Sequence, residues 1–155
     1  MRARTLAVLV CGAMVSLGAM WTVGVAGAST SRPTLGSRSY PPPGYGGRFP
    51  GFGTVAPRLV SANGDPNSVV SDVRWTSWGA KQAMGLGKSA EFAPRGGYLS
   101  GLFPVELVAT DLGRCSAHGP IVYRRLRRRD KQGNGRWSAW SYWPDVQYPK
   151  PQTLC

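Results

Sequence analysis

The stretch "FPVELVATDLGRCSAHGPIVYRRLRR", residues 103–128, indicates the fold of the chain. Apolar and polar residues alternate in its first part with the two-residue period of a β-strand, and a second, shorter apolar segment follows. The residues "DLGR" between the two segments are typical of a turn. The stretch therefore predicts two β-strands. One face of the first strand would hold Val105, Leu107 and Ala109, and the second strand would contain Ile121, Val122, Tyr123 and Leu126.

Three other segments show β patterns between turn signals. "VVSDVRW" at 69–75 predicts a strand with Val69, Ser71, Val73 and Trp75 on one face. "KQAMGLGKSAEF" at 81–92 places Gly85 and Gly87 on the face opposite Met84 and Leu86, which indicates a bulge or a close neighbour. "RWSAWSYW" at 136–143 is the last strong strand. No segment keeps a helical period, so we predict an all-β domain, a small antiparallel sandwich or barrel of about five to seven strands.

The first 28 residues have the pattern of an export signal. Arg2 and Arg4 precede an uncharged, mostly apolar run over residues 5–28. Ala26 and Ala28 occupy the small-residue positions that a signal peptidase reads, so we predict a signal peptide over 1–28 that is cleaved after Ala28. The alternative is an uncleaved membrane anchor, because the run is long enough to span a bilayer.

The mature chain divides into two parts by composition. Residues 29–67, which include "YPPPGYGG", are rich in Pro, Gly and Ser and show no lasting period, so we predict a disordered linker there. Residues 68–155 contain all the predicted strands and form the predicted secreted β domain.

Charge and cysteines agree with export. A formal net charge of +12 favours anionic partners. Cys11 would leave with the signal peptide, so Cys115 and Cys155 would remain and allow one disulfide in an oxidising compartment. The alternative is that the two thiols stay free or pair between molecules.

Part of the chain, over roughly residues 69–128, resembles a group of small exported actinobacterial proteins. The shared features are a W-x-S-W-G turn, an A-x-G-x-G strand, a P-V-x-L strand and a Cys near a Y-x-R-L strand. Many members carry an extra cysteine pair between the second and third strands, where this chain has "APRGGYLSG", so Cys155 is the candidate partner of Cys115. The resemblance implies export and a β domain and supplies no catalytic residue. The matching residues are Trp75, Ser77, Trp78, Gly79, Ala83, Gly85, Gly87, Pro104, Val105, Leu107, Cys115, Tyr123, Arg125 and Leu126.

A basic cluster follows in the same region. On a strand these side chains would repel one another unless acids or a ligand compensate, and only Asp130 is near in sequence. The cluster is therefore either an anion-binding site or a solvated edge strand whose cations block aggregation. Its residues are Arg124, Arg125, Arg127, Arg128, Arg129 and Lys131.

Trp137, Trp140 and Trp143 recur at every third residue. The run is similar to the tryptophan run of thrombospondin type 1 repeats, in which arginines of a neighbouring strand stack between the rings. A hairpin through "KQGNG" would place the arginine strand beside it. Strict strand alternation sets Trp137 and Trp143 opposite Trp140 unless a bulge intervenes. We expect mainly core rings with Arg–Trp stacking at the rim; the alternative is a binding platform for carbohydrate or nucleobases.

Catalytic chemistry has little support in the sequence. His118 is the single histidine and lies in a predicted surface turn, and no catalytic residue, metal site or cofactor is predicted. We expect a non-catalytic protein, secreted or associated with the cell envelope, that contacts an anionic envelope polymer or an acidic protein through the basic cluster. Nucleic acid is less favoured, and a membrane would be contacted only through an uncleaved signal. The alternatives are a structural or inhibitor-like envelope protein and a hydrolase that uses His118.

Overall fold

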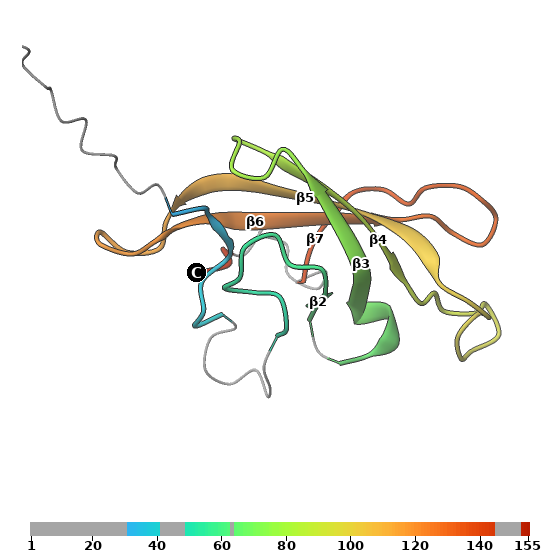
Figure 1. Ribbon diagram of the computed structural model, residues 1–155. Coiled ribbons are helices and arrows are strands. Elements are labelled where there is room, and N and C mark those ends of the chain that lie inside the picture. Colours follow the sequence, from blue (N-terminus) through green and yellow to red (C-terminus); the bar gives the residue numbers. More distant parts are fainter. Residues whose placement is uncertain (1–30, 41–48, 63, 145–152) are drawn as a thin grey trace, which may run out of the picture.

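The computed structural model of the chain describes residues 31–40, 49–62, 64–144 and 153–155. These residues form strands and one short 3-10 turn and contain no α-helix, which confirms the all-β prediction. The strands curl into one open sheet, a half-barrel (Figure 1). The elements are β1 (Thr34–Leu35), β2 (Val60–Ser61), η1 (Pro66–Ser68), β3 (Val69–Thr76), β4 (Ala83–Ser89), β5 (Phe103–Arg114), β6 (Ile121–Asp130) and β7 (Ser141–Tyr142).

The centre of the sheet is an antiparallel meander of β3, β4, β5 and β6. The sheet order is β1-β6-β5-β4-β3-β2, and β7 also pairs with β6. The short strands β1 and β7 share the outer edge of β6: β1 runs parallel to Val122 and Tyr123, and β7 runs antiparallel to Arg127 and Arg128. The two long strands of the stretch 103–128 therefore form the backbone of the sheet (Figure 1).

The two faces of the sheet differ in composition, and β4 shows it most clearly. Ala83, Gly85, Gly87 and Ser89 are buried, whereas Met84, Leu86 and Lys88 are exposed. Cross-strand partners share a face, so the register extends both faces over the neighbouring strands. The inner face carries the core side chains Val70, Val73, Val105, Leu107, Ala109, Tyr123 and Leu126. The outer face carries Arg74, Met84, Leu86, Lys88, Glu106, Val108, Arg125, Arg127 and Arg129.

The segment that precedes β3 covers the inner face, so the prediction of a disordered linker over 29–67 is wrong for its described residues. Leu35 and Val60 are fully buried, and Tyr40, Phe49 and Phe52 are at most 9% exposed. The three rings pack against one another with centroids 5.0–6.2 Å apart. Few apolar residues lie in this Pro/Gly-rich segment, but the sheet offers them an apolar face, which compensates for the ordering entropy.

The W-x-S-W-G turn after β3 attaches this covering segment to the sheet. The indole N–H groups of Trp75 and Trp78 donate to the carbonyls of Pro57 and Pro33, respectively. The Tyr123 hydroxyl accepts a 2.9 Å hydrogen bond from the Gly79 N–H and donates a 2.7 Å hydrogen bond to the Ala80 carbonyl. Burial raises the pKa of Tyr123, and the hydrogen bond from Gly79 lowers it in part.

A bulge in β3 changes which of its residues reach the core. Asp72 has φ +53°, and the register with β4 shifts between Ser71 and Arg74. Val70 and Val73 are therefore both buried, so the expected face of Val69, Ser71, Val73 and Trp75 is interrupted. The glycines of β4 lie beneath these side chains: a Cβ at Gly87 would come within 2.7 Å of Val70 Cγ1.

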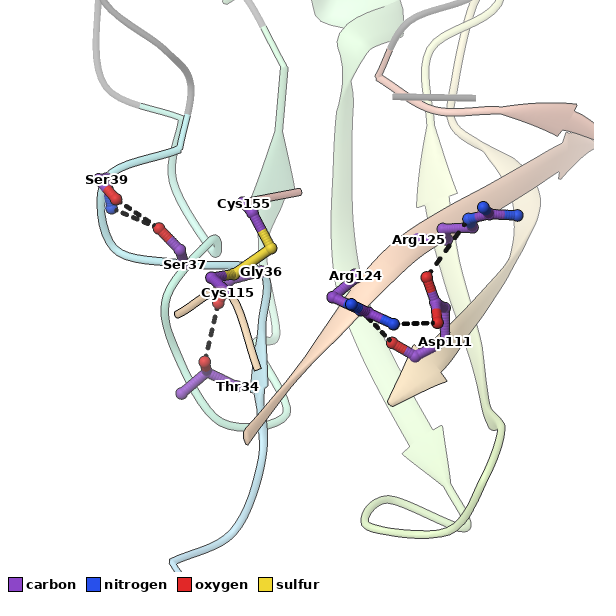
Figure 2. Close-up of a disulfide and its surroundings, with 9 residues drawn as sticks. All are labelled: Thr34, Gly36, Ser37, Ser39, Asp111, Cys115, Arg124, Arg125 and Cys155. Atoms are coloured by element: carbon purple, nitrogen blue, oxygen red, sulfur yellow. Dashed lines mark hydrogen bonds and ion pairs between the residues drawn. A yellow bond between two sulfur atoms is a disulfide. The ribbon is translucent and has the colours of Figure 1, made fainter. Parts of the chain in front are cut away.

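The C-terminal residues lie along the edge of β6, next to the disulfide that Figure 2 shows. A disulfide joins Cys115, after β5, to Cys155, with Cα atoms 5.3 Å apart. Leu154 beside it is 1% exposed. Its N–H donates to the Arg124 carbonyl, and its own carbonyl accepts from Ser37 N–H. The pair fits an oxidising, extracellular environment.

The predicted signal peptide lies outside the described residues. None of the described residues forms a helix of the length and apolar character needed to cross a bilayer.

Candidate functional site

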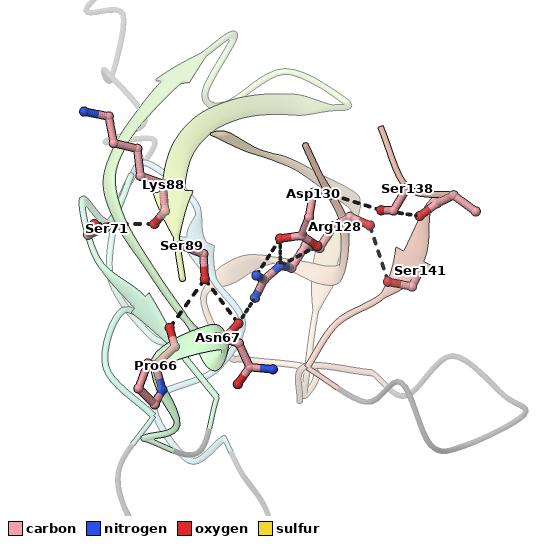
Figure 3. A network of polar contacts seen from close by, with 10 residues as sticks. Pro66, Asn67, Ser71, Lys88, Ser89, Arg128, Asp130, Ser138 and Ser141 are labelled. Atoms are coloured by element: carbon pink, nitrogen blue, oxygen red, sulfur yellow. Dashed lines mark hydrogen bonds and ion pairs between the residues drawn. The ribbon is translucent and has the colours of Figure 1, made fainter. Parts of the chain in front are cut away.

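The arginines of β6 divide between the two faces of the sheet. Arg128 lies on the inner face and is only 6% exposed (Figure 3). Its guanidinium donates to both carboxylate oxygens of Asp130 and to the Asn67 carbonyl. Its Cζ lies 5.4 Å from the centre of the Trp143 ring, which is itself 6% exposed. Arg128 therefore stabilises the core beside η1 and is not accessible to a ligand.

Arg124 and Arg125 share one carboxylate on the partner strand (Figure 2). Asp111 Oδ1 lies 2.7 Å from Arg124 Nη2, and Oδ2 lies 3.4 Å from Arg125 Nε. Asp111 has φ +59°, an unusual conformation for a residue within a strand. All three side chains are about one-third or more exposed, so these pairs contribute little stability, and Arg125 keeps unused N–H donors.

On the outer face, two arginines stack against two tryptophans. Arg129 Cζ lies 4.9 Å from the Trp137 ring centre and 4.7 Å from that of Trp140, so the guanidinium contacts both rings. Arg127 Cζ lies 5.3 Å from the Trp140 ring centre. We call these four residues the arginine–tryptophan ladder. Each contact is worth about 0.5–1 kcal/mol at an exposed site.

The ladder exists because the segment after β6 contains a bulge. Trp137 pairs with Lys131, but Ser141 pairs with Arg128, so the register moves by one residue between them. Ser138 fills the irregularity: its N–H donates to the Asp130 carbonyl, and its hydroxyl accepts from Asp130 N–H. Trp137 and Trp140 therefore contact the same guanidinium.

Two sequence-based expectations fail in this segment. Strict alternation predicted opposite faces for Trp137 and Trp140, whereas the bulge places both on the outer face. The stretch "RWSAWSYW" was expected to be a full strand, but only β7 and the Lys131–Trp137 bridge pair with β6. Trp143 alone of the three rings is buried.

Acids on the neighbouring strand compensate part of the basic cluster. Glu106 of β5 lies opposite Arg129 and accepts from its guanidinium at 2.5–2.6 Å. The sequence pattern pointed only to Asp130 and missed Glu106 and Asp111, because these acids are remote along the chain. Within the described part of the chain, the side chains of Arg127 and Lys131 have no acidic partner.

The outer face extends the positive charge beyond β6. Arg74 and Lys88 are exposed on β3 and β4 and were not expected as site residues. Leu86 lies opposite Arg74, and Met84 follows on the same face of β4; they are 54% and 38% exposed. An open depression here is lined by Arg74, Thr76, Met84, Gly85, Leu86 and Glu106. The face therefore combines cations from three strands with exposed apolar side chains and two carboxylates, those of Glu106 and of Asp111, which contacts Arg125.

His118 lies in the turn between β5 and β6 and is exposed. In the described residues no hydrogen bond joins it to Ser116 or Asp111, and the Asp111 carboxylate is held by arginines instead. The described residues also hold no group of three His, Cys, Asp or Glu side chains placed to bind a metal ion.

No family model, curated protein or solved structure matches this chain. The resemblance to exported actinobacterial proteins stays a prediction.

Proposed function

We propose that this chain is a non-catalytic protein of the cell envelope that associates with anionic envelope polymers through the outer face of its sheet. The observation that carries the proposal is the row of cations on this face, from Arg74 and Lys88 to Arg125, Arg127 and Arg129, against the two carboxylates of Glu106 and Asp111. Such an imbalance on one face attracts polyanions.

The geometry of β6 suits a linear polymer. Alternate residues of a strand repeat about every 6.7 Å on one face, so Arg125, Arg127 and Arg129 form a row of regularly spaced cations. Stacking on Trp140 orders the Arg127 side chain and leaves its N–H donors free for a phosphate or carboxylate. The ladder thus reduces the entropy lost when the polymer binds.

The test replaces Arg125, Arg127 and Arg129 together by Ser and measures binding to polyphosphate and to polygalacturonate across a salt series. We expect weaker binding and a shallower dependence of log K on log salt, since fewer counterions are released. The matched control removes three exposed cations away from this face, Arg32, Arg58 and Lys81. If both variants lose polymer binding equally, the binding depends on net charge alone and not on this face. If the first variant binds as well as the parent, the proposal is overturned.

A second candidate is a structural or inhibitor-like envelope protein whose charge serves solubility. The ion pairs of Arg124, Arg128 and Arg129 favour it, because they neutralise part of the cluster internally. Association with envelope material that persists at high salt and survives the triple substitution would support this candidate over polyanion binding.

A further inference from the structure

A second surface of the molecule lies at one end of the sheet, in the loop between β4 and β5. We call residues 91–102 the hairpin tip. Phe92 is 55% exposed, Tyr98 40% and Leu102 55%, which makes the tip the richest concentration of exposed large apolar side chains among the described residues. Exposed apolar groups gathered in one place mark interaction sites in soluble proteins.

The tip is an ordered small hairpin. Phe92 and Tyr98 form an antiparallel bridge, and their rings stack with centroids 4.7 Å apart and planes inclined by 22°. Backbone hydrogen bonds join Ala93 to Gly97 and Leu99 to Glu91. Gly96 and Gly97 have positive φ values, which close the turn "PRGG". The exposed aromatic pair is therefore fixed in place before any partner arrives.

Cations surround the tip. Arg95 is exposed at its apex. The turn after β6 packs beside the tip, since a Cβ on Gly133 would lie 3.2 Å from Leu99 Cδ1, and this turn leads to the exposed Arg136. Glu91 is the one acid of the tip, and its Oε2 is buried. The surface presented by the tip is thus aromatic, aliphatic and cationic.

We propose that the hairpin tip inserts into the interface of an anionic lipid bilayer. Aromatic side chains with adjacent cations are the combination that this interface favours, because the rings reach headgroup level while the cations meet anionic lipid. The tip lies at one end of the sheet (Figure 1) and can therefore meet the surface of a bilayer end-on. The tip and the outer face would then hold the chain between membrane and polymer.

The test follows amide hydrogen exchange of the full chain by mass spectrometry, with vesicles of phosphatidylglycerol and phosphatidylcholine in equal parts or of phosphatidylcholine alone. This readout is local, so the apolar segment 5–28, shared by all variants, does not obscure it. We expect exchange within 91–102 to slow about tenfold with the anionic vesicles only, as for a largely bound segment. The turn at 115–119, at the other end of β5, should not change.

Three variants test which side chains cause any protection. Replacing Phe92, Tyr98 and Leu102 by Ser should abolish it, whereas a matched variant at three other exposed apolar residues, Val55, Leu59 and Ile121, should retain it. Replacing Arg95 and Arg136 by Ser should weaken affinity for the anionic vesicles, by about fivefold per cation. Should the first variant misfold, Leu102→Ser alone provides the same comparison.

Three outcomes would overturn the proposal: no protection of the tip, equal protection by both kinds of vesicle, or protection that survives loss of the three apolar side chains. Cross-linking of the tip to an envelope protein without vesicle-dependent protection would assign the surface to a protein partner instead. The triple arginine variant of the outer face should keep its vesicle binding, so failure of the polymer proposal and failure of this one are separate results.

Discussion

The backbone N–H of Leu154 donates a 2.8 Å hydrogen bond to the carbonyl of Arg124. Arg124 lies on the edge of β6 between the residues that pair with β1 and the residues that pair with β7. Leu154 therefore completes the pairing of β6 and inserts its side chain into the core, while the adjacent disulfide fixes the chain at this position.

We expect Leu154→Ala to destabilise the domain by about 2–4 kcal/mol, because it removes a buried side chain and leaves a cavity beneath Gly36. Thr153→Ala, one residue earlier and exposed, is the control and should change stability by less than about 0.5 kcal/mol. Urea unfolding curves measure both. Equal effects would mean that the C-terminal residues are not docked.

Cys155→Ser should lower stability by up to about 4 kcal/mol, since the bond closes a long loop, with a sequence separation of 40 residues, in the unfolded chain. The same loss should follow when the parent is reduced, and reductant should not affect the variant. Thermal unfolding with and without reductant measures this. A parent that is equally stable in both conditions would contradict the structural role of the disulfide.

Trp143→Ala and Trp140→Ala should have different effects, because Trp143 lies in the core and Trp140 belongs to the arginine–tryptophan ladder. Trp143 is buried against Phe52, with ring centroids 6.3 Å apart, so its removal should cost about 3–5 kcal/mol. Trp140 is half-buried, and its removal should cost less than half as much while it weakens polyanion binding through the freed Arg127. Unfolding curves and polymer titrations together test the division. A larger loss of stability for Trp140→Ala than for Trp143→Ala would contradict this division.

Tyr123→Phe should destabilise the domain by about 1–3 kcal/mol, because the N–H of Gly79 and the carbonyl of Ala80 lose their partner.

Burial raises the pKa of Tyr123 above 10.0, so the folded state holds the phenolic proton more tightly than the unfolded chain. That contribution is fully present below pH 10 and is lost as pH rises through the raised pKa. The variant should therefore show a weaker alkaline loss of stability than the parent. Tyr142→Phe, at an exposed ring, is the control and should change stability by less than about 0.5 kcal/mol.

Gly87→Ala should cost about 1–3 kcal/mol, because its Cβ would meet Val70 Cγ1 at 2.7 Å and the Ser71 carbonyl at 2.8 Å. The control is Gly133→Ala, whose Cβ would meet the end of the Leu99 side chain at 3.2 Å and the Glu91 and Phe103 side chains at ordinary contact distances of 3.8 and 4.0 Å. Thermal melts compare the two. A neutral Gly87→Ala would show that β3 and β4 are less tightly packed than the structure indicates.

Local pattern predicts the strands well because alternation is a property of neighbouring residues. The face of Val105, Leu107 and Ala109 follows directly from it, and all three are buried. Bulges interrupt this rule with one inserted residue, and neither Asp72 nor the segment at Ser138 carries a strong signal such as glycine. The face expected for Val69, Ser71, Val73 and Trp75 and the side of Trp137 therefore depart from strict alternation.

The remaining failures concern contacts between distant parts of the chain. Leu35, Phe49 and Phe52 are too sparse for a period, and what buries them is the apolar face of a sheet formed mostly by later residues. Glu106 and Asp111 reach the arginines only through the register of β5 with β6. Composition correctly identified a basic cluster, but only cross-strand pairing shows which of its charges are compensated.

The parallel pairing of β1 with β6 has a consequence for the order of folding. Residues 34–35 meet 122–123, and Ser37 meets Leu154, so contacts that close the core join opposite ends of the described chain. The meander of β3 to β6 joins strands that follow one another along the chain, whereas these contacts have high contact order and large loop-closure entropy. We expect the meander to form first with its inner face bare, and the half-barrel to acquire its native stability only once residues 34–35 and 153–155 have docked. Until these residues dock, the bare inner face and the unpaired edge of β6 leave the chain prone to aggregation.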